Sequence, residues 1–98
     1  MRILIIGGTR FIGPAVVRRL YDQGHELAVF HRGETEANLP SRVSHLHGDR
    51  QRLSEHAGAF LRFVPDVVVD MAAFSEQDAQ TVMATFRGLA RRIVVLSS

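Results

Sequence analysis

The first thirteen residues, MRILIIGGTRFIG, join a short apolar run to a glycine-rich turn that leads into a helix. Residues 2–6 (RILII) are apolar and β-branched without polar alternation, which indicates a strand buried on both faces of a parallel sheet. Gly7 and Gly8 end this run, and Pro14 suits the first turn of the helix expected over residues 14–23. This order of elements predicts the start of an α/β fold.

The remaining sequence repeats the alternation of strands and helices. Further strands are expected over residues 26–30, 42–46, 67–72 and 93–96, with a short helix over residues 53–63. Short right-handed crossovers between such strands predict a doubly wound parallel sheet of order 3-2-1-4-5, which stops after its fifth strand.

A last helix is expected between Ser75 and Gly88. Ser75 is a good N-cap residue, and Asp78 stands at the position of a capping box. Gly88 is placed to stop the helix. The spacing of the apolar residues predicts a buried face made of Ala79, Val82, Met83 and Phe86.

Composition places the chain among ordinary globular proteins, because its 98 residues are 46% hydrophobic and 22% charged. No apolar run approaches the ~18 residues of a membrane span and no signal peptide is visible, so we expect a cytoplasmic protein without a membrane partner. Cysteine is absent, which excludes disulfides and thiolate chemistry. All 12 basic residues are arginine, but a net charge of +2 is too small to indicate nucleic-acid binding alone.

The glycine-rich turn lies where a doubly wound sheet binds its ligands, beyond the carboxyl end of the first strand. Glycine there allows a tight turn and lets the backbone approach a pyrophosphate, while the following helix directs its free N–H groups at the phosphates. A tight turn without a ligand is the alternative reading. The residues expected to hold a dinucleotide are Gly7, Thr9, Arg10, Phe11, Ile12 and Gly13.

Five motifs occur in a fixed order: GGTRFIG after ILII, then VFHRG, HGD, PDVVVDMAA and IVVLSS. Together they resemble the N-terminal half of the extended short-chain dehydrogenase/reductase family, which contains NAD-dependent epimerases and dehydratases. The family's Gly-x-x-Gly-x-x-Gly pattern has Arg10 at its second glycine here. In this respect the chain resembles a branch that includes reductases, sugar epimerase-like proteins and chloroplast stem-loop RNA-binding proteins.

The resemblance implies roles for residues after the third and fourth strands. It implies that Asp49 accepts a hydrogen bond from the adenine amino group and that Arg50 lines the same pocket. It also implies that Met71, Ala72 and Ala73 lie beside the ribose and pyrophosphate. The alternatives are an N-cap role for Asp49 and ordinary packing for the alanines.

The tip of the second strand bears on the choice of cofactor. An acidic residue there would bind the ribose diol of NAD, but the sequence reads Phe30-His31-Arg32, with no carboxylate before Glu34. Arg32 suits a 2′-phosphate, and Arg10 could add a second contact. The tip therefore predicts NADP and leaves NAD open, the alternative for Arg32 being a solvated loop charge.

No catalytic residue can be assigned. The resemblance implies a Tyr-x-x-x-Lys pair, but the only tyrosine is Tyr21 and lysine is absent. His45 and His47 lack a third ligand for a metal site. Residues 1–98 are therefore expected to form an incomplete dinucleotide-binding domain without a substrate domain, and its exposed fifth strand favours self-association.

Two functions remain open from the sequence. The first is the NADP(H)-binding portion of a reductase, epimerase or dehydratase that transfers a hydride to or from a small-molecule substrate. The second is an RNA-binding or regulatory module that keeps the dinucleotide-binding fold without redox turnover. The arginine-only basic set and Arg10 favour the second, whereas the low net charge is against it.

Overall fold

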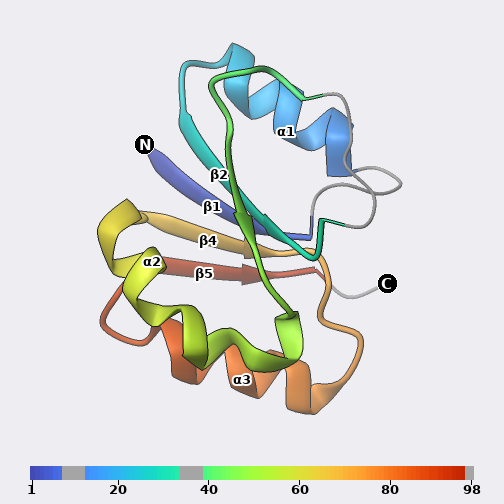
Figure 1. The fold of residues 1–98 in the computed structure, drawn as a ribbon, viewed down its shortest axis with the longest axis vertical. Helices are drawn as coiled ribbons and strands as arrows, with labels where there is room; N and C mark the ends of the chain where they lie inside the picture. The colour runs from blue at the N-terminus through green and yellow to red at the C-terminus, as the bar shows by residue number, and fades with distance from the viewer. Residues whose placement is uncertain (8–12, 34–38, 97–98) are drawn as a thin grey trace.

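The computed structural model describes residues 1–7, 13–33 and 39–96, which form one parallel sheet between two layers of helices (Figure 1). The strand order is β3-β2-β1-β4-β5, as the sequence predicts. All four pairings are parallel, so the carboxyl ends of the strands lie at one edge of the sheet. The strands are β1 (Arg2–Ile6), β2 (Glu26–His31), β3 (Ser44–His47), β4 (Val67–Asp70) and β5 (Arg92–Val95).

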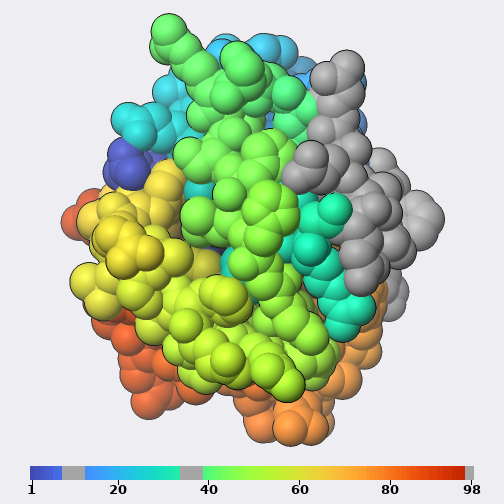
Figure 2. Space-filling model, in the orientation of Figure 1, coloured from blue at the N-terminus to red at the C-terminus, as the bar shows by residue number. Residues whose placement is uncertain are grey.

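Helices cover both faces of the sheet. Helix α1 (Gly13–Asp22) lies on one face, and the 3₁₀ helix η1 (Arg50–His56), α2 (Ala57–Phe63) and α3 (Glu76–Phe86) lie on the other (Figure 1). The segment from β3 to α2, green to yellow, forms much of the surface seen in Figure 2. No helix in the described ranges is long and apolar enough to cross a membrane.

Two apolar clusters pack the sheet against these helices. The cluster under α1 contains Val17 and alternate residues of β1 and β2, and the other places Phe60 and Phe86 against the opposite face. Alternate residues of β1 belong to different clusters, which explains why RILII shows no polar alternation. Each large side chain buried in this way contributes about 1.5–3 kcal/mol.

Several predicted element boundaries are wrong by a few residues. The third strand begins at Ser44 rather than residue 42, because the Val43 N–H donates to the Pro40 carbonyl in a turn. The helix predicted over residues 53–63 is η1 followed by α2, with a non-helical backbone at Arg52. The fourth strand ends at Asp70, two residues early.

Helix α3 begins as predicted, but its buried face differs. The Asp78 N–H donates to Ser75 Oγ at 3.1 Å, which confirms the N-cap. A capping box would require the Asp78 carboxylate to accept the N–H of Ser75. This carboxylate accepts the Phe74 N–H instead. Met83 is 48% exposed, so its predicted place in the core is wrong, and the buried residues are Asp78, Val82 and Phe86.

Candidate cofactor-binding edge

The carboxyl ends of the central strands are joined by backbone hydrogen bonds beyond the regular ladders. The Gly7 N–H donates to the Phe30 carbonyl at 2.9 Å, and the Met71 N–H donates to the Ile6 carbonyl at 2.9 Å. On the far side, the Leu96 N–H donates to the Asp70 carbonyl. The sheet therefore brings the first residues after β1, β2 and β4 to a common edge.

Gly7 has the geometry that the sequence predicts for the turn after β1. Its φ is +93°, a left-handed conformation that side chains rarely adopt. A Cβ at this position would lie 3.3 Å from the Cβ of Ala72. The backbone of this turn thus packs closely on the β4 loop, and a side chain at this position would crowd that contact.

The structure places only part of the predicted glycine motif. Gly13 is buried and begins α1. Thr9, Arg10, Phe11 and Ile12 lie outside the described residues.

Arg32 and Asp49, 17 residues apart, meet beyond the ends of β2 and β3. An Nη2 atom of Arg32 lies 3.4 Å from Oδ2 of Asp49, and both side chains are exposed. Asp49 also caps η1, because its Oδ1 accepts the Gln51 N–H at 2.9 Å. The Gln51 N–H, together with Arg32, lowers the pKa of the Asp49 carboxyl. The alternative N-cap role considered for Asp49 is therefore present, alongside the pairing with Arg32.

Arg50 turns away from this exposed tip into the protein. Its guanidinium donates to the Asp70 carboxylate and to the backbone carbonyl of Asp78. The Asp70 carboxylate also accepts the Ala72 N–H at 2.9 Å, so it holds the end of β4. Burial raises the pKa of Asp70, against the lowering effects of Ala72 and Arg50.

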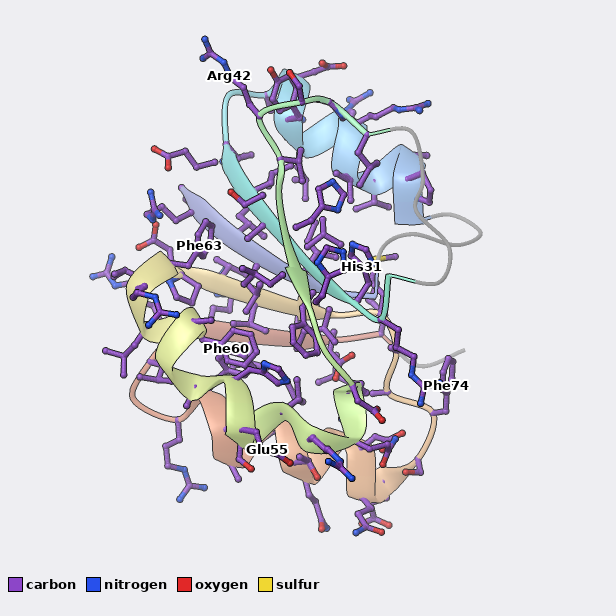
Figure 3. All side chains as sticks on the ribbon, viewed as in Figure 1. His31, Arg42, Glu55, Phe60, Phe63 and Phe74 are labelled. Carbon is purple, nitrogen blue, oxygen red and sulfur yellow. The ribbon has the colours of Figure 1, made fainter. Side chains whose placement is uncertain are left out.

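Ala72 and Ala73 lie on the β4 loop between these groups. Ala73 is buried, whereas Met71 and Ala72 are half-buried. Phe74, the next residue, is 77% exposed and lies on the same side of the molecule as His31 in Figure 3. The loop therefore offers small side chains and backbone at the edge.

Sequence reasoning assigned no role to His31, which the structure places in a histidine cluster. His31 Nε2 lies 2.9 Å from His45 Nδ1, and the rings of His31 and His47 are 4.7 Å apart. The Gly33 N–H donates to His31 Nδ1 at 2.9 Å, which makes His31 Nε2 the donor to His45. This cluster could not be found from the sequence, because it depends on the register that pairs His31 with His47 across β2 and β3. Within the described ranges, no three histidine or acidic side chains are placed to hold a metal ion.

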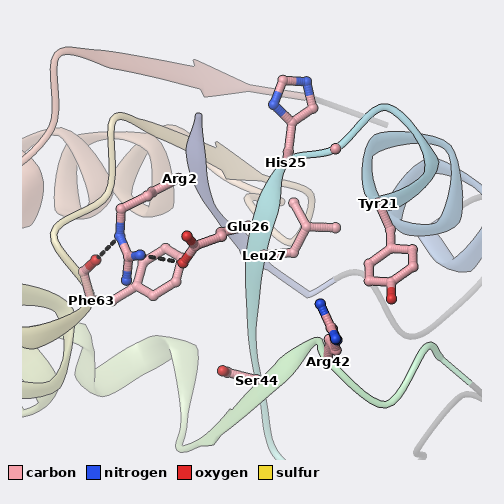
Figure 4. Close-up of a pocket in the computed structure, with 9 residues that line it drawn as sticks. Arg2, Tyr21, His25, Glu26, Leu27, Arg42, Ser44 and Phe63 are labelled. Atoms are coloured by element: carbon pink, nitrogen blue, oxygen red, sulfur yellow. Dashed lines mark hydrogen bonds and ion pairs between the residues drawn. The ribbon is translucent and has the colours of Figure 1, made fainter.

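A hollow of about 380 Å³ lies at the opposite edge of the sheet (Figure 4). Arg2, Glu26 and Ser44, the first residues of their strands, belong to its lining. The Arg2 guanidinium stacks on the Phe63 ring, donates to the Phe63 carbonyl and pairs with Glu26. This hollow is at the amino ends of the strands and is thus separate from the candidate site.

Two curated proteins are similar in sequence to this chain over nearly its whole length. The chain is 30% identical over 97 residues to 2′-dehydrokanamycin reductase of Streptomyces kanamyceticus, covering 99% of this chain and 28% of that protein. It is 28% identical over 110 residues to the chloroplast stem-loop binding protein of 41 kDa b of Arabidopsis thaliana, covering 99% of this chain and 29% of that protein. The chain thus spans less than a third of the length of these curated relatives.

A solved structure has the same fold. The Bordetella bronchiseptica enzyme WbmG, in a crystal structure with NAD, superposes with a TM-score of 0.80 and 26% identity over 97% of this chain and 36% of that one. Residues 3–89 match the NAD dependent epimerase/dehydratase family. Since this match covers most of the sequence, and the fold agrees with it, the chain belongs to the NAD dependent epimerase/dehydratase family.

Proposed function

We propose that this chain binds NADP(H) at the carboxyl edge of its sheet, as the cofactor-binding portion of a reductase, epimerase or dehydratase. The observation that carries the proposal is the left-handed Gly7 turn packed on Ala72, at the junction of β1 and β4. The presence of NAD in the similarly folded WbmG supports a nicotinamide dinucleotide as the ligand, without distinguishing NADP from NAD. When bound, the nicotinamide group accepts or donates a hydride.

The chain's own residues bind and orient the cofactor. Gly7 and Gly13 border the pyrophosphate turn, where Thr9, Arg10, Phe11 and Ile12 complete the motif. Asp49 lies on the adenosine side, whereas the side chain of the next residue, Arg50, is directed inward to Asp70 and Asp78. Met71, Ala72 and Ala73 present backbone to the ribose and pyrophosphate, because their small or half-buried side chains permit close approach.

Arg32 favours NADP over NAD. Its side chain is 59% exposed at the carboxyl end of β2, and its guanidinium lies 3.4 Å from the Asp49 carboxylate. A 2′-phosphate carries more charge than this carboxylate and takes two parallel N–H donors from a guanidinium. NADP therefore gains a contact that NAD lacks, at the cost of the pairing with Asp49.

Calorimetric titration with NADPH and NADH tests this proposal. The wild-type chain is expected to bind NADPH more tightly, and Arg32→Glu to weaken NADPH at least about tenfold while changing NADH much less. Arg42→Glu is the matched control, because it makes the same charge change at the opposite edge (Figure 3). If both variants lost NADPH affinity equally, Arg32 would act by general electrostatic attraction and not by a specific contact with the 2′-phosphate.

Absence of binding by both nucleotides to the folded wild-type chain would contradict the proposal itself. RNA binding, the alternative left open by the sequence, gains no support from the described residues, and we propose the dinucleotide function alone.

A further inference from the structure

The Arg50 side chain joins three segments that are distant in the sequence. It begins in the turn after β3 and reaches the end of β4 and the first turn of α3. One Nη2 atom donates both to the Asp70 carboxylate and to the Asp78 carbonyl, and Nη1 lies 3.9 Å from Asp78 Oδ1. The Arg50 side chain is 11% exposed and the Asp70 side chain is fully buried. We call Arg50, Asp70 and Asp78 the Arg50 clamp.

Each carboxylate of the clamp also holds a backbone N–H of the β4 loop. Asp70 accepts the Ala72 N–H at 2.9 Å, and Asp78 accepts the Phe74 N–H at 3.0 Å. The Gln51 side-chain amide donates to Asp78 at 3.3 Å. The loop from β4 to α3 is thus tied at two points to the turn that carries Asp49.

Stability alone does not explain this arrangement. Burying charges costs free energy that their pairing only partly returns, and apolar replacements of buried pairs are often neutral or stabilising. The Nε and Nη1 atoms of Arg50 are buried and lack a hydrogen-bond acceptor within the described part of the chain. What the clamp does provide is a fixed spacing, since a planar guanidinium holds its partners in directions that few alternatives satisfy.

We propose that Arg50 is a positioning residue that sets the distance between the two walls of the nucleotide site. One wall is the tip of β2 and β3, with Arg32 and Asp49. The other is the β4 loop, with Met71, Ala72 and Ala73. This proposal rests on the proposed function. A ligand that touches both walls benefits from their fixed spacing, because it need not order the loop on binding. A ligand that touches only the first wall gains nothing from the clamp.

Two ligands separate these cases: NADPH, which spans both walls, and 2′,5′-ADP, which carries only the adenosine half. In Arg50→Met the ratio of NADPH affinity to 2′,5′-ADP affinity is expected to fall about tenfold. Asp49 keeps its contacts with Gln51 and Arg32 in this variant, so 2′,5′-ADP should bind nearly as before. Arg52→Met is the matched control, because Arg52 lies on the same 3₁₀ helix and is 69% exposed.

Arg50→Lys provides a second variant that keeps the buried positive charge and thus the fold. It lacks the planar fork, so the affinity ratio should fall in this variant too. An unchanged ratio in folded Arg50 variants would overturn the clamp's role, even if their urea midpoints had fallen, because a merely structural residue changes stability alone. Wild-type chain that binds neither compound would overturn the proposed function, and the clamp's role in binding with it.

Discussion

At the scale of single residues, Gly7 illustrates how backbone conformation and close packing act together. Gly7 and Gly24 have nearly the same φ, +93° and +90°, but only Gly7 has a neighbour within 4 Å of an added Cβ. We expect Gly24→Ala to lower the free energy of unfolding by about 1 kcal/mol through backbone strain. Gly7→Ala should cost more, because its methyl group meets Ala72 as well.

Urea denaturation of the two variants measures this difference. Since the backbone strain is similar in both, the excess loss in Gly7→Ala reports the contact with the β4 loop. A Gly24→Ala variant that loses as much stability as Gly7→Ala would contradict the close packing assigned to the turn after β1.

Asp78 gives a prediction for pH dependence. The Phe74 N–H, with smaller contributions from Gln51 and Arg50, lowers the pKa of this carboxyl below its ordinary value of 3.8. A lowered folded-state pKa means that stability is present above pH 3.8 and is lost as the pH falls through the folded value. Asp78→Asn should therefore lose stability less steeply below about pH 4 than the wild type.

Urea midpoints measured between neutral and acidic pH test this slope. Glu76→Gln, an exposed carboxyl removed from the same first turn of α3, is the control. Equal slopes for Asp78→Asn and the wild type would contradict the bonding assigned to Asp78. Asp70 has the opposite effect on the pH dependence of stability. Because its pKa is raised in the folded protein, its protonation stabilises the fold as the pH falls.

The sequence predicted some of these residue contacts but not others. Arg32 and Asp49 follow neighbouring strands, so the predicted strand order already placed them at one edge. The inward turn of Arg50 could not be predicted, because its partners come from β4 and α3 and its burial depends on all three segments together. The contacts at the start of α3 could not be predicted for the same reason, because Arg50 and Gln51 of a distant segment hold the Asp78 carboxylate.

At the scale of elements, α3 shows where periodicity misleads. The predicted stripe included Met83, whereas the buried face runs through Asp78, Val82 and Phe86 at intervals of four residues. We expect Phe86→Ala to cost about 3–5 kcal/mol, as for other buried aromatic residues. Met83→Ala should change the free energy of unfolding by less than about 0.5 kcal/mol, because Met83 is a surface residue.

Thermal or urea unfolding of these two variants distinguishes the structure from the predicted stripe. A loss of several kcal/mol in Met83→Ala would mean that Met83 is buried and that α3 is rotated from its described position. The periodicity correctly gave the order of the strands and α-helices. It missed η1, because a 3₁₀ helix with a non-helical residue such as Arg52 has no regular apolar repeat.

At the scale of the whole molecule, β5 forms one edge of the described sheet. Val94 and Leu96 are 36% and 42% exposed along this edge, and an unpaired apolar edge is a template for strand pairing between chains. We therefore expect the chain to self-associate, and Val94→Lys to shift it toward monomer. Sedimentation velocity measures the shift.

Leu61→Lys is the matched control for β5, because Leu61 is 58% exposed on helix α2 rather than on an edge strand of the sheet. If Leu61→Lys reduced association as much as Val94→Lys, general surface hydrophobicity rather than strand pairing would be responsible. A wild-type chain that stays monomeric at high concentration would contradict the prediction.

The central claim is that a nicotinamide dinucleotide binds at the carboxyl edge of the sheet and not in the hollow at the amino edge. Backbone amide NMR during titration of the wild-type chain with NADPH tests this most directly. We predict shifts of the amides of Gly7, Asp49 and Ala72, while those of Tyr21 and Arg42, which line the hollow, stay unchanged. Shifts confined to Tyr21 and Arg42, or none at any amide at saturating NADPH, would contradict the claim.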